Sequence, residues 1–233
     1  MQITRRLLRK SCTIVLFAVS QISFTQTDSQ LERVLNRMDE AASSFRSTEA
    51  NFVWDQYQKV VDETDTQSGK IYFRRSGDEI QMAADITKPS PRYLLFTDSK
   101  IQIYEPKSDQ ITVYSTKNRA EVEGYLVLGF GGKGHDLLKS FDVKYLGSEK
   151  LGDLNTEKLD LVPKSAKVKN NFEHIVLWID MNRGISVQQQ LFPPLSGDYR
   201  LAKYSDIKIN QRIPDNAFKI KTTGKTKTVS TQG

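Results

Sequence analysis

The glycine-rich run Gly129–Gly134 is the part of the sequence closest to a known chemical motif. It fits the pattern G-x-G-x-x-G, whose glycines let a pyrophosphate approach the N-terminus of a helix. The strand–helix–strand context that this motif needs is missing, because only a short segment separates the run from strand-like Asp142–Leu146. We therefore expect a flexible loop between two short helices, and an exported dinucleotide-dependent enzyme remains a remote alternative.

The other reactive side chains form no catalytic or metal-binding set. His135 and His174 are the two histidines, and each fits a structural role within its own predicted element. The single cysteine, Cys12, excludes a disulfide framework within the chain and a cysteine-based zinc cluster. No G-x-S-x-G elbow is present, and acidic pairs such as Asp62 and Glu63 lie in a turn-like segment. The sequence thus predicts no enzyme, no cofactor and no metal.

Arg75 is the polar residue with the most informative position. It has the strand parity of Ile71 and Phe73, so in a regular strand it would point to the apolar face. A buried guanidinium is costly unless its donors are paired, for instance with carbonyl groups of a covering helix. Parity alone equally allows the strand to end at Phe73, which would leave Arg75 in solvent.

The net charge of +6 on these 233 residues belongs to the two ends of the chain. Four basic residues precede the short apolar run 12–20, a pattern typical of a secretory signal peptide. We assign residues 1–26 to this peptide, with cleavage between Ser20 and Gln26. Its basic part also loosely matches a twin-arginine signal, so the export route stays open. The apolar run is too short to span a membrane.

Four further lysines lie in residues 217–233, which we expect to be a basic C-terminal tail. Residues 28–216 between the ends hold 26 basic and 28 acidic residues. This nearly neutral body carries neither a basic patch nor a nucleic-acid motif, so no nucleic-acid partner is expected.

The pattern of apolar residues predicts one helix followed by many strands. Residues 29–46 place one buried helical face at Leu31, Val34, Leu35, Met38, Ala41, Ala42 and Phe45. The period then changes to two, and short β-rich runs separated by turns continue to residue 209, interrupted at 119–140 by expected short helices, the first starting near Glu121. Met181–Gly184 predicts a hairpin turn. Apolar residues on both faces of Tyr93–Phe96 and Phe172–Ile179 indicate a curved sheet covered by helices. We treat 27–216 as one domain.

Several of these features, in this order, resemble the LolA family of periplasmic lipoprotein carriers. Gly69–Arg75 is similar to the family's glycine-hydrophobic-arginine strand, and Ile101–Pro106 to its apolar strand that ends Tyr-x-Pro. The N-terminal helix and the late β-hairpins also fit. The chain departs from the pattern at Ser76, where the family prefers proline, and at Asp98–Lys100, which only approximates its turn.

The resemblance implies an α+β fold: an unclosed antiparallel β-barrel, or half-barrel, with an N-terminal amphipathic helix and short helices as a lid or plug over an apolar cavity. It implies that Arg75 is buried and holds the lid closed through hydrogen bonds to helix backbone. Strand parity then predicts the following cavity-lining residues: Phe52, Trp54, Ile71, Phe73, Leu95, Ile103 and Trp178.

The function implied is that of a monomeric periplasmic chaperone that carries lipoprotein acyl chains, or related lipids, from the inner to the outer membrane. Its expected partners are an inner-membrane lipoprotein-releasing ABC transporter and an outer-membrane acceptor. A periplasmic sensor of lipid or lipoprotein on the same fold is the first alternative.

Overall fold

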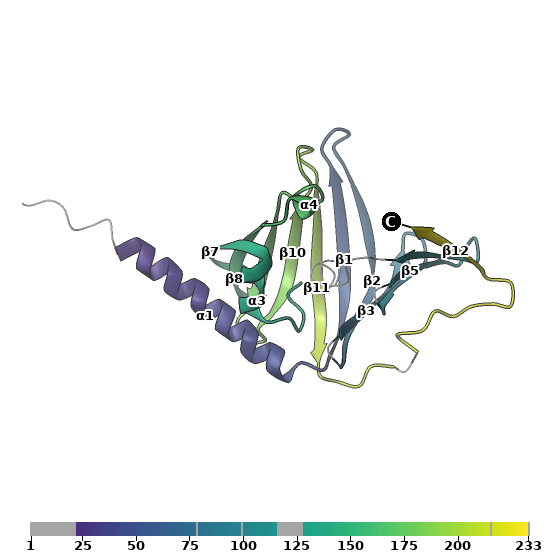
Figure 1. Cartoon of the computed structure of the whole chain (residues 1–233), viewed down its shortest axis with the longest axis horizontal. Helices are drawn as coiled ribbons and strands as arrows, with labels where there is room; N and C mark the ends of the chain where they lie inside the picture. Colours follow the sequence, from purple (N-terminus) through teal and green to yellow (C-terminus); the bar gives the residue numbers. More distant parts are fainter. Residues whose placement is uncertain (1–21, 78, 99, 116–127, 215, 233) are drawn as a thin grey trace, which may run out of the picture.

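The computed structural model describes residues 22–77, 79–98, 100–115, 128–214 and 216–232 (Figure 1). The signal peptide expected at 1–26 lies almost wholly outside these ranges, as does the start of the helix expected near Glu121. No helix within the described ranges is long and apolar enough to cross a membrane.

The N-terminal helix α1 spans Ile22–Ser44, so it begins before the predicted residue 29 and ends two residues before the predicted residue 46. Its apolar stripe is buried as expected, with Val34, Leu35 and Met38 each no more than 2% exposed. Two short helices, α3 (Gly134–Ser140) and α4 (Ala166–Lys169), follow later in the chain.

The described chain also contains twelve strands. They are β1 (Ser47–Gln58), β2 (Glu63–Ser76), β3 (Glu79–Lys88), β4 (Arg92–Thr97), β5 (Lys100–Glu105), β6 (Gln110–Ser115), β7 (Phe141–Leu151), β8 (Leu154–Pro163), β9 (His174–Asp180), β10 (Ile185–Phe192), β11 (Tyr199–Ile209) and β12 (Lys227–Gln232). The predicted turn at Met181–Gly184 joins β9 to β10, with Gly184 at a φ of 70°.

All twelve strands form one sheet, in the order β12-β6-β5-β4-β3-β2-β1-β11-β10-β9-β8-β7. The two meanders β1–β6 and β7–β11 join where β1 pairs with β11, and every pairing is antiparallel except β12 with β6. The sheet curves without closing, because β7 and β12 stay unpaired with each other (Figure 1). The predicted unclosed half-barrel is thus confirmed.

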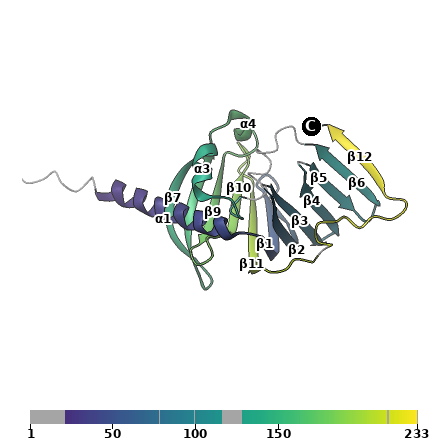
Figure 2. The same ribbon diagram turned by 60° about the horizontal axis from the view of Figure 1, so that its bottom comes forward.

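Residue pairing across the strands defines two faces of the sheet, because directly opposed residues share a face. Trp54 on β1 lies opposite Gln67 on β2 and Ala202 on β11, and Ala202 lies opposite Gln189 on β10. We call the face that carries Trp54 the inner face and its reverse the outer face. Leu177 on β9 lies opposite Gln189 and packs with α1, so the helix covers the inner face (Figure 2).

The inner face holds the two larger hydrophobic clusters. The first is centred on β1–β3 and contains Phe45, Ala50, Phe52, Ile71, Phe73, Ile80, Met82, Ala84, Ile86, Phe96, Phe130 and Ile185. The second joins α1 and α3 to β7–β9 through Val34, Leu35, Met38, Leu128, Leu137, Phe141, Leu159, Leu161, Ile175, Leu177 and Ile179.

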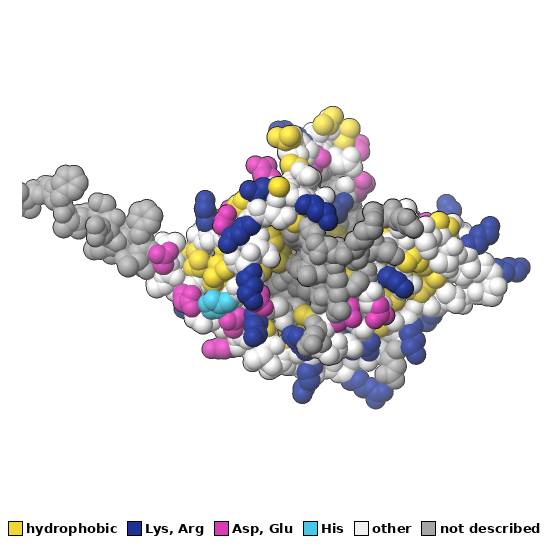
Figure 3. Space-filling model, in the orientation of Figure 1, with side chains coloured by type: hydrophobic (Ala, Val, Ile, Leu, Met, Phe, Trp, Pro, Cys, Tyr) yellow, Lys and Arg dark blue, Asp and Glu magenta, His cyan; other side chains and the backbone are white. Residues whose placement is uncertain are grey.

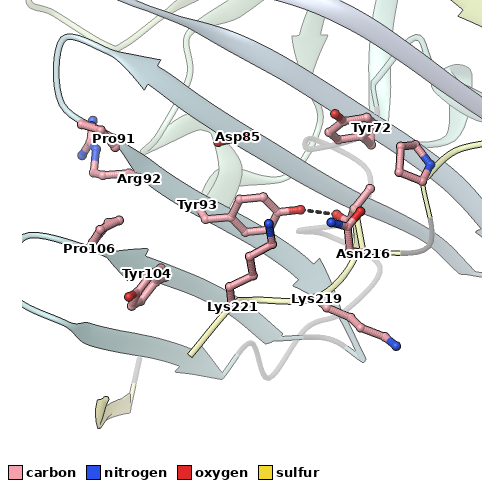
Figure 4. A pocket seen from close by; sticks show the side chains of 12 residues that line it. Tyr72, Asp85, Pro91, Arg92, Tyr93, Tyr104, Pro106, Asn216, Lys219 and Lys221 are labelled. Carbon is pink, nitrogen blue, oxygen red and sulfur yellow. Dashed lines mark hydrogen bonds between the residues drawn. The ribbon is translucent and has the colours of Figure 1, made fainter. Parts of the chain in front are cut away.

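The end of the chain is attached to the outer face. Ala217 and Phe218 are buried there against Ala83 and Leu95, and the Tyr93 hydroxyl donates a hydrogen bond to the Ala217 carbonyl (Figure 4). Strand β12 then pairs in parallel with β6, beside which it lies in Figure 2. The lysine-rich residues 217–232 therefore pack on the domain instead of extending from it as a separate tail.

Candidate functional site

An open cavity of about 490 Å³ lies on the inner face, a size within the usual range for small-molecule sites. Strands β1–β5, β10 and β11 supply its walls. Its apolar lining residues are Trp54, Ile71, Met82, Ile86, Leu94, Ile103, Leu191, Leu201, Ala202 and Tyr204. Its polar lining residues are Asp55, Gln56, Gln67, Arg92, Gln189 and Arg200. We call this the inner cavity. Figure 3, drawn in the orientation of Figure 1, shows hydrophobic side chains to the left and to the right of the centre of the molecule.

A second cavity of about 500 Å³ shares lining residues with the first, among them Gln56, Leu191 and Arg200. It extends toward α4 and the loop between β10 and β11, where Phe172 and Pro194 contribute to its wall. The inner cavity and this neighbour therefore adjoin at the residues that they share.

The predicted cavity residues are distributed over both faces of the sheet. Trp54, Ile71 and Ile103 line the inner cavity. Phe52 and Phe73 share the inner face but lie in the core beside the cavity, where they are 2% and 0% exposed.

Leu95 and Trp178 lie on the outer face, so the structure does not bring them to the cavity. Leu95 lies opposite Ala83 and packs under the C-terminal residues, while its neighbour Leu94 lines the inner cavity. Trp178 lies opposite Lys158, whose ammonium is 4.9 Å from the centre of its ring. Both positions correct the assumed parity by one residue, because runs with apolar residues on both faces leave the parity undetermined.

The sequence did not predict two polar residues on the wall of the inner cavity, Gln189 and Tyr204. The Tyr204 hydroxyl lies 3.5 Å from Gln189 Oε1 and is hydrogen-bonded by Trp54, and Gln189 Nε2 donates to the carbonyl of Leu128. Burial raises the pKa of Tyr204, so its hydroxyl stays protonated. Alternation in β10 and β11 could have revealed Gln189 and Tyr204 as facing residues once the register with β1 was known.

A third pocket, of about 300 Å³, lies on the outer face beneath the C-terminal residues (Figure 4). Three tyrosines line it together with Lys219 and Lys221. Burial raises the pKa of Tyr93 and keeps its hydroxyl a hydrogen-bond donor toward Ala217.

Arg75 joins the end of β2 to the end of α1 and to the glycine run. Its Nε donates to the Phe45 carbonyl at 3.2 Å, and its Nη2 donates to the Gly131 carbonyl at 2.7 Å. The residue is nevertheless exposed, which corrects the expectation that it is buried. The guanidinium finds its carbonyl partners at the rim of the sheet, where water also reaches it.

The glycine run is explained by close packing against its neighbours. A Cβ on Gly131 would lie 2.4 Å from the Phe45 ring, and one on Gly134 would lie 2.5 Å from the Leu35 carbonyl oxygen. Directly before Gly131, the Phe130 ring stacks on Phe73 with centroids 4.4 Å apart. The glycines therefore let this loop seat against α1 and fill the core, a role that needs no nucleotide.

His135 fastens α3 to α1 through two carboxylates. Its Nδ1 lies 2.6 Å from Asp39 Oδ2, and its Nε2 lies 3.1 Å from Glu32 Oε1. The hydrogen bond with Asp39, aided by the one with Glu32, raises the pKa of His135 above its usual value.

This raised pKa gives the helix contact a pH dependence. A folded-state pKa above the unfolded value stabilises the protein fully below about pH 6.5, and the stabilisation is lost as the pH rises through the folded pKa. The melting temperature of the wild type should therefore exceed that of His135→Gln by more at about pH 6 than at about pH 8. An equal difference at both pH values would contradict a charged His135 in this contact.

Comparison with known proteins gives a family for the chain. Residues 43–221 match the family model described as outer membrane lipoprotein carrier protein LolA. None of the curated proteins compared matches the chain.

Solved structures share the fold at low sequence identity. An uncharacterized conserved protein from Thermus thermophilus is 10% identical with a TM-score of 0.56, over 87% of this chain and 99% of that one. MucB in the MucA/MucB complex of Pseudomonas aeruginosa is 13% identical with a TM-score of 0.50, over 82% of this chain and 61% of that one. Since the family model covers most of the sequence and the half-barrel fold agrees with it, the chain belongs to the LolA family.

Proposed function

We propose that this protein is a periplasmic carrier that binds the acyl chains of lipoproteins, or of related lipids, in the inner cavity and moves them from the inner to the outer membrane. The observation that carries the proposal is the apolar inner cavity of about 490 Å³ on a LolA-family half-barrel. Each methylene removed from water gains about 0.8 kcal/mol, so a chain of about 16 carbons gains roughly 12 kcal/mol. This gain suffices to hold a chain that would otherwise aggregate.

A carrier must also release its cargo, and Arg75 offers the means. Its two hydrogen bonds hold the glycine run and the end of α1 over one end of the inner face. Such bonds are polar and partly exposed, so opening costs little compared with the gain from burying a chain. In this proposal the inner-membrane partner is an ABC transporter that releases lipoproteins, and the outer-membrane partner is an acceptor.

Transfer between membranes tests the proposal directly. Protein purified from periplasm should carry a lipoprotein or lipid visible by native mass spectrometry. Loaded protein should pass that cargo to acceptor vesicles that contain outer-membrane components. Protein that holds no lipid and transfers none would disprove the carrier function.

A lipid-sensing or lipoprotein-sensing module is the second candidate. The half-barrel is shared with MucB, which has been solved in complex with MucA. A sensor would bind lipid in the same cavity and transfer none, so the same experiment separates the two candidates.

Arg75→Leu should load normally and release cargo more slowly. Without the two hydrogen bonds, the closed empty state loses stability and competes less well with the ligand-bound state. We expect transfer to acceptor vesicles to fall about tenfold, which corresponds to about 1.4 kcal/mol. Arg46→Leu is the matched control, because Arg46 is exposed one residue after Phe45. Unchanged loading and release in Arg75→Leu would remove the latch from the mechanism.

A further inference from the structure

The wall of the inner cavity contains a guanidinium with an unsatisfied nitrogen. Arg92, at the start of β4, lies opposite the inner-face residue Ile86 and is half-buried. Its Nη2 donates to Gln67 Oε1 at 2.9 Å, so the side chain reaches across β3 to β2. Its Nε is buried and finds no hydrogen-bond partner in the described part of the chain. A buried donor without a partner is costly, so an acceptor on a bound molecule would be stabilised there.

A second arginine lines the same cavity from the opposite side. Arg200 on β11 lies opposite Gln56 and Leu191, and it contributes to both the inner cavity and its neighbour. Arg92 on β4 reaches β2 through Gln67, and Arg200 is an exposed residue of β11 beside β1, so the two arginines line the cavity from strands on its two sides.

The acidic lining residues of the inner cavity and its neighbour, Asp55 and Asp198, are already engaged. Asp55 accepts from Lys203 Nζ at 3.0 Å and from Thr66 at 2.8 Å. Asp198 accepts from the backbone N–H of Lys59 at 2.9 Å. Among the ion pairs found within the described residues, none involves Arg92 or Arg200. Two positive charges at the wall of an apolar cavity are thus left for a ligand.

The chemistry of that ligand follows from the two parts of the cavity. Ile71, Met82, Ile86, Leu94 and Ile103 offer only apolar contacts, which suit an acyl chain. Guanidinium groups match the geometry of carboxylate and phosphate oxygens, and such charge-assisted hydrogen bonds are about twice as strong as neutral ones.

We propose that the inner cavity selects amphiphiles with an acidic headgroup, a carboxylate or a phosphate, which Arg92 and Arg200 bind while the acyl chain lies on the apolar wall. This inference rests on the proposed lipid-binding function and names its ligand class. The Nε of Arg92 gains its missing acceptor from the headgroup, and uncharged lipids of the same chain length leave it unsatisfied.

Ligand pairs that differ only in charge test the inference. Delipidated protein is titrated calorimetrically at about pH 8 with laurate, methyl laurate, dodecyl phosphate and inorganic phosphate, since carboxyl groups are ionised there. The wild type should bind laurate and dodecyl phosphate at least tenfold more tightly than methyl laurate. Arg92→Gln and Arg200→Gln should each lose most of this preference and keep the affinity for methyl laurate. Lys144→Gln, which removes an exposed positive charge on β7, should keep the preference.

Each outcome separates this inference from the proposed function. If methyl laurate binds as tightly as laurate, headgroup selection is wrong and lipid binding stands. If no chain binds, the proposed function fails. If inorganic phosphate binds as tightly as dodecyl phosphate, the site is a free-anion site and the amphiphile is ruled out. Should Arg92→Gln fold poorly, the wild-type preference and the Arg200→Gln titration still decide.

Discussion

Ile103→Asp is expected to weaken acyl-chain binding by at least a hundredfold while leaving the fold intact. Ile103 lines the inner cavity and is only half-buried in the empty protein, so the new carboxylate keeps some water there. A bound chain would remove that water and leave an ionised group against methylenes, at a cost of several kcal/mol. A hundredfold loss of affinity corresponds to about 2.7 kcal/mol of binding free energy, which is less than this cost. Titration with a fluorescent fatty acid measures the loss.

Gln102→Asp is the matched control for this experiment. Gln102 is the preceding residue on β5 and lies opposite Leu95, so it belongs to the outer face. The same charge placed there should leave the affinity for the fatty acid unchanged. Equal losses in the two variants would mean that the inner cavity does not hold the chain.

Phe73→Ala should destabilise the folded state by about 3–5 kcal/mol. The Phe73 side chain is 0% exposed and stacks on Phe130, whose loop Arg75 holds in place. Truncation would leave a cavity at the point where β2, the glycine run and the end of α1 meet. For a domain of this size the melting temperature should fall by about 10 °C.

Val60→Ala provides the comparison for Phe73→Ala. Val60 is 93% exposed at the tip of the β1–β2 hairpin, and surface substitutions of this kind usually change stability by less than about 0.5 kcal/mol. A loss of less than about 1 kcal/mol for Phe73→Ala would show that the loop repacks and that the Phe73–Phe130 stack is not a fixed part of the core.

The sequence predicted two kinds of feature: elements with one apolar and one polar face, and turns whose residues favour the required backbone angles. The stripe of α1 is one example, and the turn at Met181–Gly184 is another, because asparagine and glycine favour its geometry. Parity failed in Tyr93–Phe96 and in β9, where apolar residues fill both faces. Apolar cover on the outer face of β4 comes from Ala217 and Phe218 and not from a helix.

The attachment of the C-terminal residues could not be read from composition. Lysine and threonine dominate residues 217–232, and only two buried side chains anchor them. The backbone of β6 supplies the remaining attachment by pairing with β12, and pairing of backbone groups leaves little trace in side-chain pattern. Likewise, Arg92 gives no signal in the sequence, because its importance depends on the partner that its Nε lacks.

The seam between β1 and β11 has a kinetic consequence. Thr48 pairs with Ile209 and Tyr57 with Tyr199, so the middle of the sheet is built from segments at nearly opposite ends of the described chain. Each meander contains mostly local contacts, whereas this seam requires closure of a loop that comprises almost the whole domain, and such non-local pairing slows folding. During synthesis, β1 stays without its second neighbour until β11 has been made. The apolar inner wall is therefore completed only after β11 has been made, and until then a nascent chain exposes the part of it that β1 carries.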